Sequence, residues 1–588
     1  MSTRARRTTL GALVALALLS HAGSLANGFV YDDHRFVAEN PALVDLSWRD
    51  ALLDPATHTA DDDRDVYRPL RALSHAADRE AWGLDPFGFH LHSVLLHALS
   101  VALVALCLRR LLPTRYAPAA LFGAAVLAVH PVGAEAVDWI SSRGDQLALG
   151  FTALALLVAT WPRRALSLPL LGLLACAATL GKESAAVLPA VIALHGFVLR
   201  RSDAPGAAAL VRGSVVAASL GVALALGLRQ LALHGVSPMQ TVPHGGDAFS
   251  QVGWALFGIG TSVTHLLWPS ALAVSYPQST WAAAGTPWWQ LPSLLGAGLL
   301  GALSVALWRA RSRARVSAPF AWFVFLGAWG VLAYLPSSSL LVTLRELVND
   351  RGLLPCLAPL GAACALPFCH LQRAAARVVP ALLVVALLLP ITWQRVEDFR
   401  SDAHLWQATL RVDPESPGAH LGLARELLTV GQAEAALELM QRGADVAPAG
   451  SKQRAELLAH WGDALLRHGH DDHATLAVLS QALAAVRHWD ALEHPSIVGD
   501  ATAASLAEAL VRDQRPDQAF ALLDTERARA ARPEQLDLKR AILLRELMGT
   551  EGRTSPWLGD FDETFERVTR ALPDHPLVNG LSRWRAGL

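Results

Sequence analysis

The residues best suited to chemistry in this sequence lie just outside its apolar runs. Asp32 and Asp33 stand side by side in the stretch "NGFVYDDHRF", directly after the first apolar run. Adjacent carboxylates raise each other's pKa, and a membrane surface removes part of their hydration, so such a pair is costly unless it has a use. A carboxylate in this position could take the proton of an attacking hydroxyl group. The pair is therefore our leading candidate for a general base.

A second group of charged residues falls in one short connection between apolar runs. The connection reads "HPVGAEAVDWISSRGDQ" and contains His130, Glu135, Asp138, Arg143 and Asp145. So many charged residues in one short connection make it a candidate binding site. The alternative is a cap of salt bridges that joins two helices.

Three further charged stretches stand near predicted spans. Lys182 and Glu183 lie in "GKES" at the end of one span, where a buried charge costs about 2.5 to 3.5 kcal/mol on insertion scales. Lys182 could pair with a phosphate or with Glu183, and Arg351 in "VNDRGLL" precedes a late span. The run Asp61–Asp63 lacks the Gly and the distal Glu of a calcium loop, so we expect a solvated turn there.

The sequence does not predict a metal site. Three histidines stand close to helical spacing in "HLHSVLLH": His90, His92 and His97. They have no supporting Cys or carboxylate, and we expect core or interfacial histidines. The five cysteines lie in or beside apolar segments and are interpreted as packing residues. Two alternatives to the general base remain for the Asp32–Asp33 pair: the carboxylates hold the structure of the loop, or they bind a divalent cation.

The elements that must hold these residues are mostly membrane helices. The chain has 588 residues, of which 53% are hydrophobic and 17% are charged, far from the composition of a soluble enzyme. The formal net charge of −1 gives no reason to expect nucleic acid as a partner. We therefore expect a multi-pass protein, and we place it in a bacterial inner membrane.

Apolar runs predict the spans, and basic loops predict their cytoplasmic ends. Together they predict about eleven spans, a cytoplasmic N-terminus and an extracytoplasmic segment 27–90. The first run is interpreted as an uncleaved span, and 251–272 as a re-entrant or surface-lying helix. The predicted spans are 10–26, 91–108, 117–134, 146–161, 166–181, 185–199, 212–232, 290–308, 318–335, 352–369 and 378–394.

The last third of the chain changes to Ala, Leu and charged residues at helical spacing. This change predicts two domains, 1–395 and 396–588. Residues 417–448 match the spacing of a helix-turn-helix repeat of about 34 residues, a second copy at 462–478 repeats that spacing, and a third at 507–523 does so more weakly. They look like tetratricopeptide repeats; the alternative is an ordinary helical domain, because the third copy lacks the turn Gly. Since such repeats bind peptides or proteins on a concave face, we expect an extracytoplasmic domain that recruits the acceptor or a partner protein.

Five stretches resemble one known family in order and spacing: "GFVYDDHRFVAENP", "VYRPLRALS", "GLDPFGFHLHSVLLHALS", "HPVGAEAVDWISSRGDQLAL" and "GKESAAVLP". The family is that of the transmembrane and TPR-repeat-containing protein O-mannosyltransferases, which are integral-membrane glycosyltransferases of the GT-C class. The resemblance covers about residues 26–200, with weaker matches at "WPSALAVSYP" and "VNDRGLLPCLAPL". It implies an all-α fold, in which a polytopic transmembrane bundle precedes an α-solenoid of repeats.

The resemblance also implies a reaction and its residues. A sugar, mannose by the family name, would pass from a polyprenyl-phosphate donor to a hydroxyl of a protein or glycan acceptor outside the membrane. The acidic pair of the family falls on Asp32 and Asp33, and we prefer Asp32 as the base. Arg351 departs from the family pattern, because the aromatic residue usual a few places later is absent. Donor or acceptor contacts are implied for Tyr67, Arg68, Glu135, Arg143, Lys182 and Arg351.

Two other classes of function compete with a glycosyltransferase. In the first, a catalytically silent bundle anchors the repeats as a scaffold, but an anchor has no use for charges at so many ends of spans. In the second, the bundle transports a lipid-linked sugar across the membrane. A transporter predicts charges in both halves of the bundle and repeat symmetry between the halves, and the sequence displays neither.

Overall fold

The computed structural model confirms an all-α protein in the part of the chain that it describes. Every regular element among those residues is helical, and none is a strand. The acidic run Asp61–Asp63 lies outside the described residues. These are 3–58, 66–199, 207–233, 243–277, 281–282, 286–310, 317–344, 346–468, 471–492, 496–549 and 552–587.

The chain divides into two compact units, Met1–Asp413 and Pro414–Leu588. This division lies one helix later in the chain than the boundary expected from the sequence, and the helix between them is α17 (Asp402–Val412). The sequence pattern changes near 395 because the membrane-like apolar run ends there, whereas α17 still packs within the first unit. The helix is short, and its buried residues Leu405 and Trp406 pack with the segment that follows α1 and with the segment that leads into α7.

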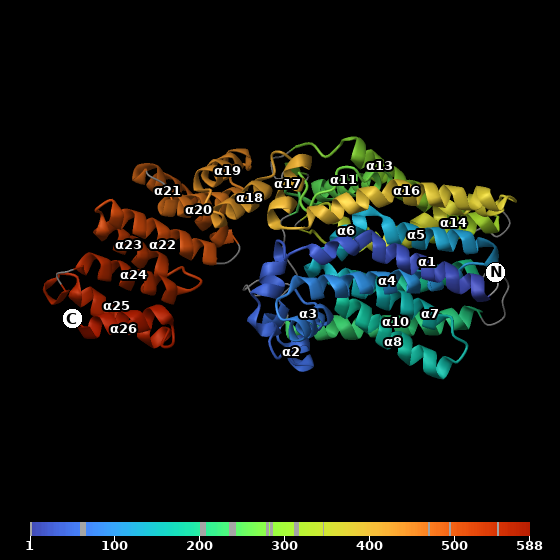
Figure 1. The fold of residues 1–588 in the computed structure, drawn as a ribbon, viewed down its shortest axis with the longest axis horizontal. Helices are drawn as coiled ribbons and strands as arrows, with labels where there is room; N and C mark the ends of the chain where they lie inside the picture. Colours follow the sequence, from blue (N-terminus) through green and yellow to red (C-terminus); the bar gives the residue numbers. More distant parts are fainter. Residues whose placement is uncertain are drawn as a thin grey trace. The chain divides into compact units, whose positions relative to one another are not determined.

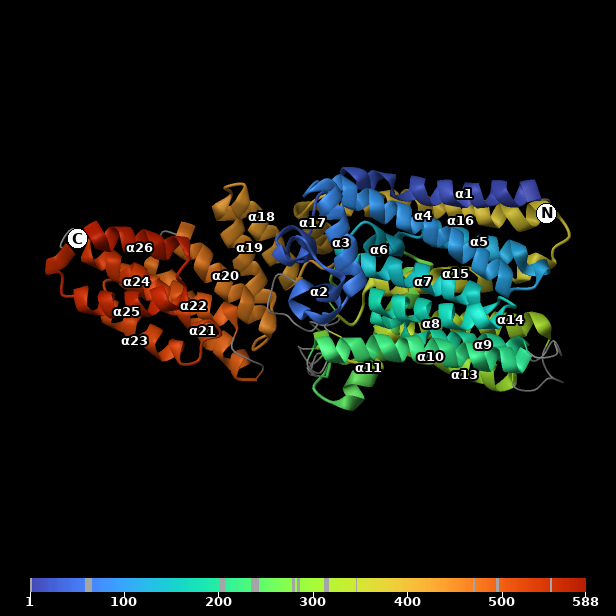
Figure 2. The ribbon, with the colours of Figure 1, turned by 90° about the horizontal axis from the view of Figure 1, so that it is seen from below.

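The first unit is a bundle of long helices with shorter helices at one end. In both views of Figures 1 and 2, α2, α3 and α17 gather at one end of the bundle, while the N-terminus lies at the other. The helices, in chain order, are α1 (Thr3–His21), α2 (Trp48–Leu53), α3 (Pro69–Trp82), α4 (Pro86–Leu111), α5 (Ala117–Val129), α6 (Ala134–Val137), α7 (Arg143–Ala159), α8 (Arg164–Gly181), α9 (Leu188–Leu199), α10 (Ala207–Ala232), α11 (Ala248–Leu267), α13 (Leu291–Ala310), α14 (Ala318–Tyr334), α15 (Leu354–Ala365), α16 (Ala374–Asp398) and α17.

Each predicted span coincides with a helix of this unit. Within the described residues, eight helices are long and apolar enough to cross a membrane, and α5 with α6 forms a ninth candidate that is bent by 56°. The other two expected spans correspond to α7, of 17 residues, and to the shorter apolar helix α9. The eight long candidates are α1, α4, α8, α10, α13, α14, α15 and α16. The helix α11, which covers most of the expected re-entrant segment, is not among them.

Small residues let the helices of the bundle approach closely. A Cβ on Gly123 of α5 would lie 2.3 Å from the carbonyl oxygen of Ala358 in α15. A Cβ on Gly221 of α10 would lie 2.0 Å from the carbonyl oxygen of Gly172 in α8. Without a hydrophobic driving force between membrane helices, such backbone contact is a main source of association. The two glycine contacts therefore bring α5 close to α15 and α8 close to α10.

The second unit consists of helices that pack against their neighbours in the chain. Gly431, at a φ of +78°, allows the tight turn between the first two of them. The small and large residues of the predicted repeat, Ala424, Ala436 and Met440, are buried together in that pair. The helices are α18 (Pro417–Thr429), α19 (Ala433–Val446), α20 (Lys452–His468), α21 (Asp472–Leu492), α22 (Ile497–Arg512), α23 (Pro516–Arg527), α24 (Pro533–Met548), α25 (Leu558–Ala571) and α26 (Pro576–Gly587).

Candidate functional site

Asp33 ties the segment after α1 to the connection between α6 and α7. Its side chain is fully buried, and it accepts hydrogen bonds from the backbone N–H of Val30 at 3.1 Å and from the N–H and hydroxyl of Ser141 at 2.7 and 2.5 Å. Burial raises the pKa of this carboxyl to about 7, although the bonds from Ser141 and Val30 oppose the rise. Asp33 therefore closes the turn within residues 28–36, a segment called the acidic hairpin below, and holds this segment against the bundle.

Asp32 points elsewhere and keeps an accessible carboxylate. Its side chain is 20% exposed, and one oxygen pairs with Nε of Arg35 at 3.0 Å. A carboxylate that is partly exposed in this way can accept a proton from an incoming group. Of the two adjacent carboxylates, Asp32 thus has the geometry that suits a general base.

Three of the predicted binding cations each pair with a carboxylate nearby. Nζ of Lys182 lies 2.6 Å from Oδ1 of Asp145, and Nη2 of Arg68 lies 3.3 Å from Oε1 of Glu183. The charges of Arg68 and Arg351 both repel that of Lys182, which places the three cations in one neighbourhood. An anion that binds there would meet three cations, each of which it would share with the carboxylate that already pairs with it.

Glu135 and Arg351 form the third pair. Glu135 is almost fully buried; it accepts hydrogen bonds from the backbone N–H groups of Asp350 and Arg351 at 2.8 and 3.2 Å, and from Nη1 of Arg351 at 2.7 Å. The guanidinium of Arg351 lies over the ring of Trp139 at 4.8 Å and is 27% exposed. Attraction to Asp145 and Asp32 acts on the same guanidinium. Glu135 therefore orients Arg351, whose side chain stays partly exposed.

Arg143 and Tyr67 lie in the protein interior. The guanidinium of Arg143 is fully buried and donates to Asp78, to the hydroxyls of Ser74 and Ser93, and to the carbonyl of Phe89 at 2.7 Å. These contacts join α7 to α3 and α4. The buried Tyr67 donates its hydroxyl to a backbone carbonyl of α2 at 2.9 Å. The geometry gives both side chains partners within the protein and leaves neither at the accessible cluster.

The predicted histidines have separate partners. Nε2 of His90 lies 3.2 Å from the carbonyl of Gly28, His92 pairs with Asp78 at 2.7 Å, and the ring of the buried His97 packs edge-on against that of His21. His130 contacts a backbone carbonyl at the end of α11, and Asp138 pairs with His21 at 2.9 Å. In the described part of the chain, no group of three or more His, Cys, Asp or Glu residues is arranged to hold a metal ion.

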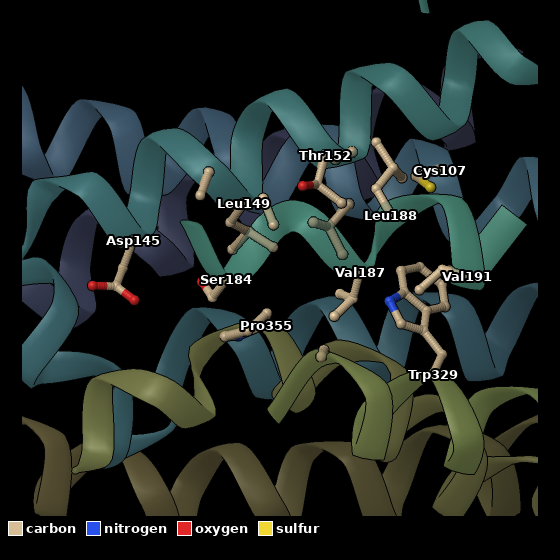
Figure 3. Close-up of a pocket in the computed structure, with 15 residues that line it drawn as sticks. Cys107, Asp145, Leu149, Thr152, Ser184, Val187, Leu188, Val191, Trp329 and Pro355 are labelled. Carbon is tan, nitrogen blue, oxygen red and sulfur yellow. The ribbon is translucent and has the colours of Figure 1, made fainter. Parts of the chain in front are cut away.

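An apolar cavity begins beside the Lys182–Asp145 pair. Figure 3 shows Asp145 and Ser184 at one end of the cavity, Leu149 and Leu188 along it, and Trp329 with Cys107 at the other end. Its walls come from α4, α7, α9, α14 and α15, which are apolar helices of the bundle. The lining is therefore mostly apolar, with the carboxylate of Asp145 at the end beside the ion pair.

Comparison with known proteins confirms the resemblance drawn from the motifs. The chain is 35% identical over 186 residues to protein O-mannosyl-transferase Tmtc1 of Drosophila melanogaster and 32% identical over 203 residues to Tmtc2 of the same organism. It is 31% identical over 153 residues to TMTC2 of Homo sapiens. The chain is similar to protein O-mannosyl-transferases.

The extent of these matches is partial. They cover 29%, 31% and 24% of this chain, and the chain spans 20%, 20% and 17% of the length of the three relatives. No family model matches the chain. Among solved structures, ArnT from Cupriavidus metallidurans bound to undecaprenyl phosphate aligns over 79% of this chain and 80% of its own, with 13% identity and a TM-score of 0.36.

Sequence reasoning missed several residues of this region. Arg71, the second Arg of "YRPLRALS", is buried over the ring of Phe36 and donates to the backbone carbonyl of His58 at 3.0 Å. Burial lowers its pKa to about 9. Asp350 accepts from Tyr276 at 2.6 Å and pairs with His265 at 2.9 Å, so it is held by α11 and the segment after it. Asp350 had a sequence signal as the neighbour of Arg351; the other partners had none, because they are distant in the chain.

Proposed function

We propose that this chain is an integral-membrane glycosyltransferase that moves a sugar from a polyprenyl-phosphate donor to an acceptor hydroxyl. The observation that carries the proposal is the junction of two features. A cluster of cations and a partly exposed carboxylate adjoins an apolar cavity that runs into the bundle. A donor with an anionic head group and a prenyl tail has the same division of properties. The similarity to protein O-mannosyl-transferases supports mannose as the sugar and a protein as the acceptor.

In the proposed reaction, Asp32 takes the proton of the acceptor hydroxyl as its oxygen attacks the anomeric carbon. The bond between that carbon and the phosphate oxygen breaks, and the electron pair leaves with the phosphate. Lys182 and Arg351 would stabilise the departing phosphate by charge-assisted hydrogen bonds, with Arg68 nearby. The prenyl tail would lie along the cavity beside Leu149. No metal ion is needed for this proton and charge balance, because the carboxylate and the cations supply it.

The proposal places this chemistry on the extracytoplasmic face of a bacterial inner membrane, as the distribution of basic residues predicts. The second unit would then lie on the same face of the membrane. There it would act as a domain of tetratricopeptide repeats that recruits the acceptor or a partner protein. An accessible site at the end of the bundle where α2 and α3 gather fits an acceptor too large to enter the membrane.

The test compares two variants of the same segment, each of which replaces an Asp by the uncharged Asn. Asp32→Asn removes the base, and Asp45→Asn is the control, because Asp45 is exposed and at a φ of +53° that Asn tolerates well. In the first assay, purified protein in lipid discs receives polyprenyl-phosphate mannose. In the second, cells from which the protein has been deleted are given one variant or the other, and mass spectrometry compares their glycoproteins and glycolipids. We expect Asp32→Asn to reduce transfer by about 100-fold or more. Full restoration of every lost modification by this variant would refute the assignment.

A further inference from the structure

The residue just before the candidate base has an unusual backbone conformation. Tyr31 has a φ of +50°, in the left-handed region that a bulky residue rarely adopts. Such a conformation persists only where the surroundings hold it. The partner that holds it comes from the other end of the unit's sequence: Oδ1 of Asp402, the first residue of α17, accepts the backbone N–H of Tyr31 at 2.7 Å.

The second oxygen of the same carboxylate faces the other side of the acidic pair. Oδ2 of Asp402 lies 2.7 Å from Nε2 of His34. Asp402 therefore contacts the residue before Asp32 and the residue after Asp33. One carboxylate spans the hairpin, so the direction of both acidic side chains depends on it.

Packing and backbone contacts fasten the same hairpin to the junction of α16 and α17. The ring of Tyr31 stacks on Trp139, with ring centres 5.6 Å apart, and meets Trp406 of α17 edge-on at 5.0 Å. The backbone N–H of Gly28 donates to the carbonyl of Arg400 at 3.0 Å. Trp139 also lies under Arg351. The same ring therefore contacts both the hairpin that carries the candidate base and the candidate phosphate-binding Arg351.

We propose that Asp402 is a positioning residue for the acidic hairpin. By accepting the N–H of Tyr31 it maintains the left-handed turn that directs Asp33 inward and Asp32 toward the accessible cluster. Its link to catalysis rests on the proposed glycosyltransferase function; its effect on the hairpin does not. This assigns a role in the site to a residue about 370 positions from the acidic pair, in a helix that the sequence pattern groups with the repeats.

A different role for Asp402 would be to stabilise α17 alone. Ser401 caps that helix by accepting the N–H of His404, and a carboxylate in the first turn interacts well with the helix dipole. A purely helical role predicts that replacing Asp402 lowers thermal stability and leaves the hairpin unchanged. The positioning role predicts a change at residues 28–36 themselves.

The experiment compares Asp402→Ala, Asp402→Asn and the control Gln407→Ala, which alters an exposed residue of the same helix. Hydrogen exchange of peptides covering 28–36 is measured on the full-length protein in lipid discs, together with kcat and KM for polyprenyl-phosphate mannose. We expect Asp402→Ala to speed exchange in 28–36 about tenfold and to lower kcat about 10- to 100-fold with little change in KM. Asn can still accept the N–H of Tyr31, so in Asp402→Asn both the exchange rate of 28–36 and kcat should be close to those of the wild-type protein.

A second background tests the mechanism directly. In Tyr31→Gly the left-handed turn is free of side-chain strain, so adding Asp402→Ala should cost less kcat than it does beside Tyr31. Exchange in 28–36 that is the same in Asp402→Ala and Gln407→Ala would overturn the positioning role, whatever the activity. If exchange changes as expected but the wild-type protein transfers no sugar, the glycosyltransferase function fails while the structural role of Asp402 stands.

Discussion

Replacing Lys182 by Met offers the sharpest separation of structure from chemistry in this site. The side chains of Lys182 and Asp145 are only 8% and 5% exposed, and their charged atoms are 2.6 Å apart. At an effective dielectric constant of about 20 this separation corresponds to about 6 kcal/mol of attraction, which offsets the cost of burying both charges. Lys182→Met leaves Asp145 buried without its partner, and we expect a loss of about 3 to 5 kcal/mol of stability.

The double variant Lys182→Met with Asp145→Leu removes both charges and should recover most of that stability. If Lys182 also contacts the donor phosphate, the double variant will be stable but poor at catalysis. One lost hydrogen bond to a charged group, about 1.5 to 3 kcal/mol, corresponds to a fall of about 10- to 150-fold in kcat/KM for the donor.

The assays are thermal unfolding in detergent and initial rates at varied donor concentration, with Asp145→Asn as the matched single variant. A double variant that keeps the kcat/KM of the wild-type protein would refute the phosphate contact. Single variants that unfold at the wild-type temperature would refute the energetic argument for the buried pair.

Three further predictions concern the neighbouring groups. Arg143→Met removes the guanidinium from the buried Asp78, which keeps His92 as a partner at 2.7 Å, so the unfolding temperature should fall by the equivalent of about 1.5 to 3 kcal/mol, while the folded fraction keeps its KM for the donor. Glu135→Gln keeps an acceptor for the backbone but loses the charge that orients Arg351; kinetics should show a higher KM for the donor, with about 1 to 2 kcal/mol of stability lost. The folded pKa of Asp33, about 7, lies above the ordinary value of 3.8, so the folded protein binds the extra proton between these values. The contribution of Asp33 to the free energy of unfolding therefore falls as pH rises from about 4 to 7 and is constant above. Thermal unfolding measured from pH 4 to 8 should show this fall in the wild-type protein and lose it in Asp33→Asn.

The membrane helices were predictable because hydrophobicity is a local property of the chain. A run of apolar residues must leave water wherever it lies, and each predicted span coincides with a helix. The stretches around Asp32, Glu135 and Lys182 were equally visible, since charges at the ends of apolar runs are costly and therefore conspicuous. The resemblance of these stretches to a family of O-mannosyltransferases was also readable from their order.

Tertiary structure alone decided what each charge does. The residues themselves did not separate Asp32 from Asp33, and Asp32 was preferred only through the family resemblance, whereas the turn at Tyr31 sends Asp33 inward and leaves Asp32 accessible. Arg143 and Lys182 both read as cations near a span, yet Arg143 joins three helices in the interior, and Lys182 pairs with Asp145, which lines one end of a cavity. The role of a charge depends on the partners that folding brings to it from distant parts of the chain, and those partners leave no pattern in the residues beside it.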